Sequence, residues 1–291
     1  MNKKSPMRRI KPMKKLTKIL AIGMALLLLA GMTGCAEKED PIGTVKEGTD
    51  LFSSNQKDPK EAYEEAVKRM EELDALSYTL DIDLEHKDAD SETEYIGMFY
   101  EMKTEQTEGK LSKMVMEGTI TAPGTQGYTL RAYMLDEYFY IDVAGLKGKF
   151  KTTNLEDLTG IVEVPQQQNF TSDVFKNIHS KTKDGATEIS FTADGAKIME
   201  QMESALGEYS LTTGSDGSYE GITFDDAEGT VTIAKNGYLS DLNLSLPMTM
   251  EQESVVITYH IVYQNPGEKV TFEFPSFNGY YDYSEYITGE N

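Results

Sequence analysis

Residues 77–84 read Ser-Tyr-Thr-Leu-Asp-Ile-Asp-Leu, so that Tyr78, Leu80, Ile82 and Leu84 alternate with polar residues. This period of two predicts a strand with one buried face. The same alternation returns in residues 95–103, 113–121, 128–135 and 137–143, with no helical pattern between them. Five successive strands predict an antiparallel meander and argue against a doubly wound parallel sheet.

Helical patterns flank this meander. From Pro59 to Leu73, apolar residues recur at spacings of three and four, with Asp58 as the N-cap. Further along, Asn154 can cap a helix over 155–162, and Thr171 or Ser172 can open a short turn that runs to Ile178. A strand over 187–192 then leads at Asp194 into another helix.

A second meander follows a Gly/Ser-rich loop at 213–218. We expect its strands at 229–234, 239–246, 253–263 and 269–274. They are divided by Asn236-Gly237, by a break at Pro247 and by Asn265-Pro266-Gly267. Asn-Gly between two alternating runs is a strong hairpin signal.

The first 34 residues have the plan of a bacterial export signal. They hold eight Lys and Arg residues and no Asp or Glu, and the apolar run Ile19 to Ala30 follows the basic part. This run of about 12 residues is short for a membrane span, which needs about 20. An uncleaved short anchor is the alternative, and Met13 is an alternative start to Met1.

Cys35 is the single cysteine and directly follows Gly34. The segment resembles the lipobox of bacterial lipoproteins, although Met32 stands where Leu is usual. The resemblance implies a diacylglycerol on the Cys35 thiol and cleavage before it, and two acyl chains give stable anchoring. A free exported thiol is the alternative.

Residues 36–58 are polar and read as a tether that extends to at most roughly 75 Å. Of the 28 Lys and Arg residues, 20 follow the signal, against 49 Asp and Glu, so the exported part has a net charge of −29. Such a charge repels phosphate backbones, and nucleic-acid binding is therefore excluded as a first expectation.

The order of these elements resembles the superfamily of bacterial lipoproteins similar to the carrier LolA and to LppX-type lipoproteins, and most closely the uncharacterised surface lipoproteins of Gram-positive bacteria. The resemblance covers about residues 59–275 and rests on layout. It implies an α+β fold: a strongly curved antiparallel half-barrel of nine to ten strands with helices packed on its concave side. We divide the chain into a signal peptide (1–34), a lipidated tether (35–58), this domain (59–278) and a Tyr-rich acidic tail (279–291).

No catalytic or metal-binding pattern stands out. His86, His179 and His260 lie far apart, and nucleophile-elbow, Walker and dinucleotide-binding motifs are missing. Acidic clusters such as Asp81 with Asp83 are read as solvated faces. We therefore expect a protein that is not an enzyme, with no cofactor and no metal ion.

Flexible and aromatic side chains inside the predicted strands suggest a ligand cavity. Methionine adapts to variable apolar shapes, which suits acyl chains, although ordinary core packing is the alternative for each residue. The candidate lining residues are Met98, Tyr100, Met102, Met114, Met116, Leu130 and Met134.

The sequence leaves three functions open. The first is a lipid-anchored protein on the extracytoplasmic face of the cell membrane that binds a lipid or the acyl chains of a lipoprotein. The second is a module that binds or senses envelope proteins, and an enzyme on cell-wall polymers is third. An exposed apolar groove would favour the first function, whereas a filled core with a broad aromatic surface patch would favour the second.

Overall fold

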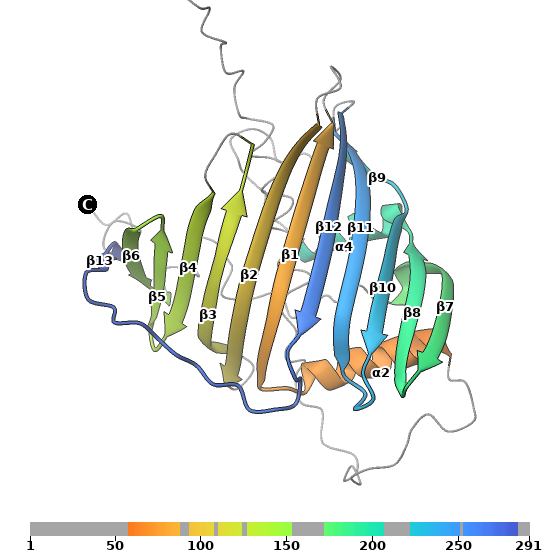
Figure 1. Ribbon diagram of the computed structural model, residues 1–291, viewed down its shortest axis with the longest axis horizontal. Helices are drawn as coiled ribbons and strands as arrows, with labels where there is room; N and C mark the ends of the chain where they lie inside the picture. Colours follow the sequence, from red (N-terminus) through yellow and green to blue (C-terminus); the bar gives the residue numbers. More distant parts are fainter. Residues whose placement is uncertain are drawn as a thin grey trace, which may run out of the picture.

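The computed structural model describes residues 58–87, 93–107, 110–123, 127–152, 172–206, 222–250 and 253–284. In this part of the chain the strands form one 13-stranded sheet. Figure 1 shows the strands side by side in a single open layer, with β13 near one edge and β7 at the other. The signal peptide, Cys35 and the predicted tether up to residue 57 lie outside the described residues.

The first half of the sheet is an antiparallel meander. The predicted five-strand run is confirmed, and a sixth strand extends it. The strands are β1 (Ala75–Lys87), β2 (Thr93–Thr107), β3 (Lys110–Thr121), β4 (Tyr128–Leu135), β5 (Tyr138–Val143) and β6 (Leu146–Lys151).

The second half continues from β1 through β12 to the other edge. Its strands are β7 (Phe175–Lys183), β8 (Ala186–Ala193), β9 (Ile222–Phe224), β10 (Ala227–Ile233), β11 (Leu239–Met250) and β12 (Glu253–Tyr263). The chain then crosses back to β13 (Tyr281–Asp282), which pairs with β6. The predicted Asn236-Gly237 hairpin between β10 and β11 is confirmed, and Gly237 takes a φ of 84°.

The sheet has an apolar and a polar face. We call the face that carries Leu80, Ile82 and Tyr259 the inner face, because all three side chains are buried. The outer face carries Asp81, Asp83 and the other residues that alternate with these. Antiparallel partners point to the same face, so the pairing of β1 with β12 joins the two halves into one apolar surface.

Helix α2 (Pro59–Glu71) begins where the sequence predicts, with the Asp58 carboxylate accepting a hydrogen bond from the Lys60 amide at 2.8 Å. Its apolar stripe, which includes Tyr63 and Met70, is buried against the inner face. The Tyr63 ring meets Phe175 edge to face at 4.9 Å between centroids. The helix therefore covers the β7 side of the sheet.

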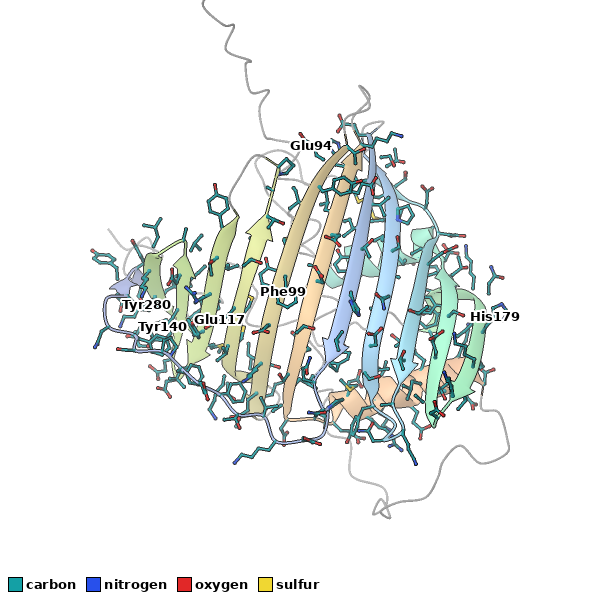
Figure 2. All side chains as sticks on the ribbon, viewed as in Figure 1. Glu94, Phe99, Glu117, Tyr140, His179 and Tyr280 are labelled. Carbon is teal, nitrogen blue, oxygen red and sulfur yellow. The ribbon has the colours of Figure 1, made fainter. Side chains whose placement is uncertain are left out.

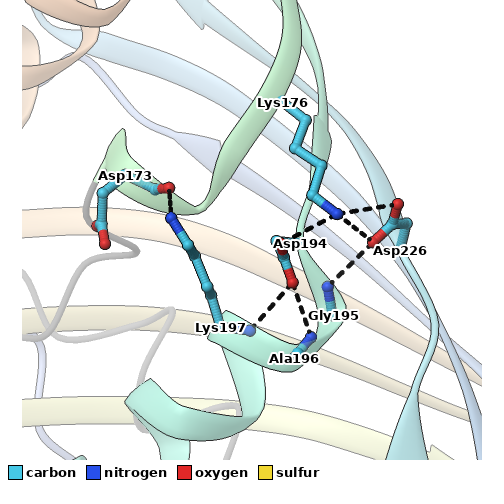
Figure 3. A network of polar contacts seen from close by, with 7 residues as sticks. All are labelled: Asp173, Lys176, Asp194, Gly195, Ala196, Lys197 and Asp226. Atoms are coloured by element: carbon cyan, nitrogen blue, oxygen red, sulfur yellow. Dashed lines mark hydrogen bonds and ion pairs between the residues drawn. The ribbon is translucent and has the colours of Figure 1, made fainter.

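Helix α4 (Gly195–Leu206) is anchored by the network in Figure 3. The Asp194 carboxylate accepts hydrogen bonds from the Ala196 and Lys197 amides and pairs with Lys176 of β7 at 3.0 Å. The Asp226 carboxylate joins the same Lys176 ammonium at 3.0 Å. Neither described helix is long and apolar enough to span a membrane.

The predicted α+β half-barrel of nine to ten strands, with helices on its concave side, is wrong. The described residues form a mainly β structure with one large open sheet and two α-helices. These helices pack chiefly against β7, β9, β11 and the 3-10 turn η1 (Ser172–Val174), so they do not form a layer over the sheet.

The predicted number of strands was too low because some strands show little alternation of apolar and polar residues. β6 reads Leu-Lys-Gly-Lys-Phe-Lys, and β7 is also rich in Lys and largely exposed, because both lie near the edges of the sheet. The predicted short turn through Ile178 becomes η1 followed by β7. The predicted helix over 155–162 lies outside the described residues.

Two predictions in the second meander are also wrong. Residues 269–274 do not form a strand. β11 runs through Pro247 without a break. On one side, β11 pairs with β10 up to Ser245 and with β9 from Met248 onward. Pro247 therefore lies in the gap between these two partners. A proline at such an interruption removes little of the hydrogen-bond ladder.

Candidate functional site

The predicted cavity-lining residues lie together on the inner face of β2, β3 and β4. Met102 pairs with Met116, and Met114 pairs with Met134, across adjacent strands. We call this set the methionine face. It consists of Met98, Tyr100, Met102, Met114, Met116, Leu130 and Met134.

Most of the methionine face is packed. Five of its members are 1–8% exposed, whereas Met116 and Leu130 are partly buried and pack against the same core. A ligand on this face would therefore have to displace side chains. Methionine suits such a change because its unbranched, polarizable side chain has three rotatable bonds.

Tyr100 is held in place by a glycine on the next strand. Gly118 lies directly opposite Tyr100, and a Cβ atom on Gly118 would be 2.4 Å from Cδ1 of the Tyr100 ring. The ring therefore lies over the glycine backbone. This contact fixes one aromatic side chain among flexible ones.

The inner face becomes exposed toward its β6 edge. Leu130 pairs with Val143, and Val143 pairs with Leu146. The three side chains form a row whose exposure rises from partial at Leu130 to 40% at Val143 and 80% at Leu146. Val143 and Leu146 are not among the candidates that the sequence pattern indicates. The sequence feature that could have indicated them is their position on either side of the tight Ala144-Gly145 turn, where polar residues are usual.

The chain between β12 and β13, residues 264–280, runs across the outer face, and we call it the strap. Figure 2 shows Tyr140 and Tyr280 side by side near β5, with Glu117 close to them. The Phe277 ring stacks on Tyr140 at 3.7 Å between centroids, and it meets Tyr133 edge to face at 5.7 Å. The strap is thus fixed by aromatic contacts on the polar side of the sheet.

Under this aromatic cluster, polar side chains are paired. The Tyr133 hydroxyl donates to the Glu117 carboxylate at 2.7 Å, and Arg131 lies 3.8 Å from both Glu117 and Asp142. Burial, followed by the hydrogen bond to Glu117, raises the pKa of Tyr133 above its usual 10.0. The phenol is therefore neutral at physiological pH and serves as a structural donor.

Two hollows are lined mainly by residues of the outer face. One, of about 650 Å³, lies between the strap and β1 to β3, and its lining includes Thr79, Glu101, Lys103, Glu117, Glu273 and Phe274. The other, of about 470 Å³, lies over β7, β8, β10 and β11, and its lining includes His179, Thr192, Glu228 and Asn243. The lining of the first hollow is mostly polar, which does not suit an acyl chain.

The histidines lie on separate strands. His86 contacts the Glu253 carboxylate at 3.0 Å, and His260 contacts Asp241 at 2.9 Å. In the described part of the chain, no group of three or more His, Cys, Asp or Glu side chains is arranged to hold a metal ion.

No family model matches the sequence, and no curated protein matches it either. Among solved structures, the lipoprotein LppX of Mycobacterium tuberculosis is similar over 73% of this chain and 97% of its own, with 13% identity and a TM-score of 0.37. A LolA superfamily protein from Nitrosomonas europaea is similar over 74% of this chain and 94% of its own, with 11% identity and a TM-score of 0.24. A protein of a family of unknown function from Desulfovibrio piger is similar over 73% and 95%, with 11% identity and a TM-score of 0.21. Solved structures to which this chain is distantly similar therefore include LppX and a LolA superfamily protein.

Proposed function

We propose that this protein is an extracytoplasmic lipoprotein, anchored in the cell membrane through Cys35, that binds acyl chains on its methionine face and catalyses no reaction. The observation that carries the proposal is the continuity of that face. All seven candidate residues share the inner side of three adjacent strands, and α2 and α4 pack chiefly elsewhere.

The physical basis is the transfer of hydrocarbon from water onto adaptable apolar side chains. Burying apolar surface yields about 25 cal/mol per Å², so a long acyl chain can offset the rearrangement of several methionines. The row Leu130, Val143 and Leu146 leads from this face to the surface, and we propose that the ends of the bound acyl chains point toward this row.

The lipid anchor and the net negative charge determine how far from the membrane the methionine face lies. In our proposal, the diacylglyceryl group on Cys35 holds the protein at the membrane, and residues 36–58 let the domain move within roughly 75 Å of it. The net charge of −29 keeps the domain off anionic head groups. The ligand is then a lipid or a lipoprotein taken from the same membrane.

Native mass spectrometry with lipid extraction tests ligand binding. The protein starting at Ala36 is purified without detergent, and we expect a stoichiometric bound lipid. Met116→Arg places a charge on the methionine face and should abolish lipid copurification. Thr119→Arg is the matched control, because Thr119 is exposed on the outer side of the same strand.

Circular dichroism must show that both variants are folded. A wild-type protein that remains free of lipid after incubation with membrane lipids would overturn the proposed function. Equal lipid binding by the two Arg variants would instead remove the methionine face as the site.

The anchor is tested separately. Cys35→Ser should abolish metabolic labelling with palmitate and should leave the precursor uncleaved. Retained labelling in this variant would contradict lipidation at Cys35, which is the single cysteine.

A protein-binding module is the second candidate, and the packed methionine face and the exposed aromatic residues on the described surface favour it. Tyr95 and Phe99 of β2 are 61% and 41% exposed, and the rings of Tyr281 and Tyr283 lie 4.8 Å apart at the β13 edge. In this case Tyr95→Ser combined with Phe99→Ser should weaken crosslinking to an envelope protein and leave lipid copurification unchanged. Unchanged crosslinking would count against this second function.

A further inference from the structure

The centre of the inner face contains a buried hydroxyl oxygen, that of Tyr259, with no hydrogen-bond partner among the described residues. Tyr259 of β12 is 2% exposed, and its hydroxyl oxygen has no hydrogen-bond partner in the described part of the chain. The buried Tyr133 differs in this respect, since its hydroxyl donates to Glu117. A buried hydroxyl without a partner is costly and requires an explanation.

The position of Tyr259 connects it to the methionine face. Tyr259 pairs with Ile82 of β1, and Ile82 pairs with Met98 of β2, so the three side chains form one row on the inner face. Adjacent strands are about 4.8 Å apart, which places the backbone of Tyr259 about 10 Å from that of Met98. A lipid whose acyl chains lie along the methionine face and point toward β6 would bring its polar end within reach of this row.

We propose that the Tyr259 hydroxyl donates a hydrogen bond to an ester carbonyl of an acyl lipid bound along the methionine face. This inference rests on the proposed function and specifies the class of ligand as an ester-linked lipid. The acceptor is uncharged, because the neighbours of Tyr259 in the row are apolar and a buried carboxylate would need a compensating charge. Burial also raises the pKa of Tyr259 well above 10.0, so the hydroxyl keeps its proton.

The test compares two lipids that differ in the acceptor. Full-length protein in octyl glucoside is titrated by native mass spectrometry with dioleoylglycerol, a neutral ester lipid, and with its dialkyl ether analogue, which lacks the carbonyls. One hydrogen bond corresponds to a preference of about 2- to 10-fold for the ester lipid. Tyr259→Phe should remove that preference by weakening ester binding, while binding of the ether lipid stays the same.

Tyr133→Phe is the matched control, since it removes a buried hydroxyl from the outer face and should leave the preference intact. Melting curves establish that both variants are folded. Equal binding of the two lipids by the wild-type protein, or an unchanged preference in Tyr259→Phe, would overturn the role of Tyr259 while leaving acyl-chain binding in place. Failure of both lipids to bind the wild-type protein would overturn the proposed function together with this inference.

Discussion

Tyr100 lies across the backbone of Gly118, its direct partner on β3, so closely that residue 118 has no room for a Cβ atom on that side. The same Cβ atom would also come within 2.3 Å of the Phe99 carbonyl oxygen. Since a backbone atom cannot rotate away as a side chain can, this position requires glycine. The contact fixes the position of the Tyr100 ring at the centre of the methionine face.

Gly118→Ala should therefore destabilise the fold. We expect the free energy of unfolding to fall by about 1–3 kcal/mol, the usual range for overpacking. Urea denaturation measures this loss. Gly97→Ala is the control on the neighbouring strand, because its Cβ atom would meet the side-chain oxygen of Thr121, which can move, at 2.9 Å. A loss at Gly97 as large as that at Gly118 would contradict the special role of the Tyr100 contact.

The strap should depend on Phe277. This ring stacks on Tyr140 and meets Tyr133 and Tyr280 edge to face. Each aromatic pair contributes about 0.5–1.5 kcal/mol beyond area burial, so Phe277→Ala should lower the free energy of unfolding by about 1–3 kcal/mol. It should also speed proteolysis of the C-terminal segment.

Tyr281→Ala is a suitable comparison for this measurement, because Tyr281 is 55% exposed. We expect a smaller loss in that variant. Proteolysis of Phe277→Ala at the wild-type rate would show that the strap is held by contacts other than this stack.

Tyr259→Phe should stabilise the protein when no lipid is bound. The variant removes a buried hydroxyl that has no described partner, and such a group costs about 1–3 kcal/mol. Thermal melting of delipidated protein should therefore give a higher melting temperature for the variant. A lower melting temperature would mean that the hydroxyl is satisfied in the lipid-free protein.

The start of α4 should loosen in acid. The hydrogen bond from Lys176, followed by that from the Lys197 amide, lowers the pKa of Asp194 below its usual 3.8. A carboxyl group with a lowered folded-state pKa stabilises the fold above its unfolded pKa, and this contribution is lost as the pH falls through the folded pKa.

Asp194→Asn keeps a good N-cap but loses the ion pair. We expect it to melt at a lower temperature than the wild type at pH 7, and we expect the difference to disappear as the pH falls below 3.8. Asp194→Ala should melt lower still, because it also loses the cap. A difference between the wild type and the Asn variant that does not shrink as the pH falls below 3.8 would contradict this account.

Local patterns in the sequence were enough to predict the elements that are stabilised by residues close to them in the sequence. The alternation in residues 77–84 predicts β1, since a half-buried strand shows its period in its own residues. Asp58 with Pro59, and Asp194, mark the starts of α2 and α4, since capping acts within one turn. Asn236-Gly237 locates a hairpin for the same reason. All seven candidate residues fall within the predicted alternating runs at 95–103, 113–121 and 128–135.

Only the tertiary structure decided how these elements combine. β6 and β7 lie near the edges of the sheet, where a strand needs no continuous apolar side, so their sequences carry little alternation. The row from Tyr259 through Ile82 to Met98 depends on the pairing of residues 177 and 16 positions apart. The stack of Phe277 on Tyr140 likewise joins distant segments. The register between strands that are distant in sequence is set by packing of the whole inner face, so it cannot be predicted from the residue pattern of a single strand.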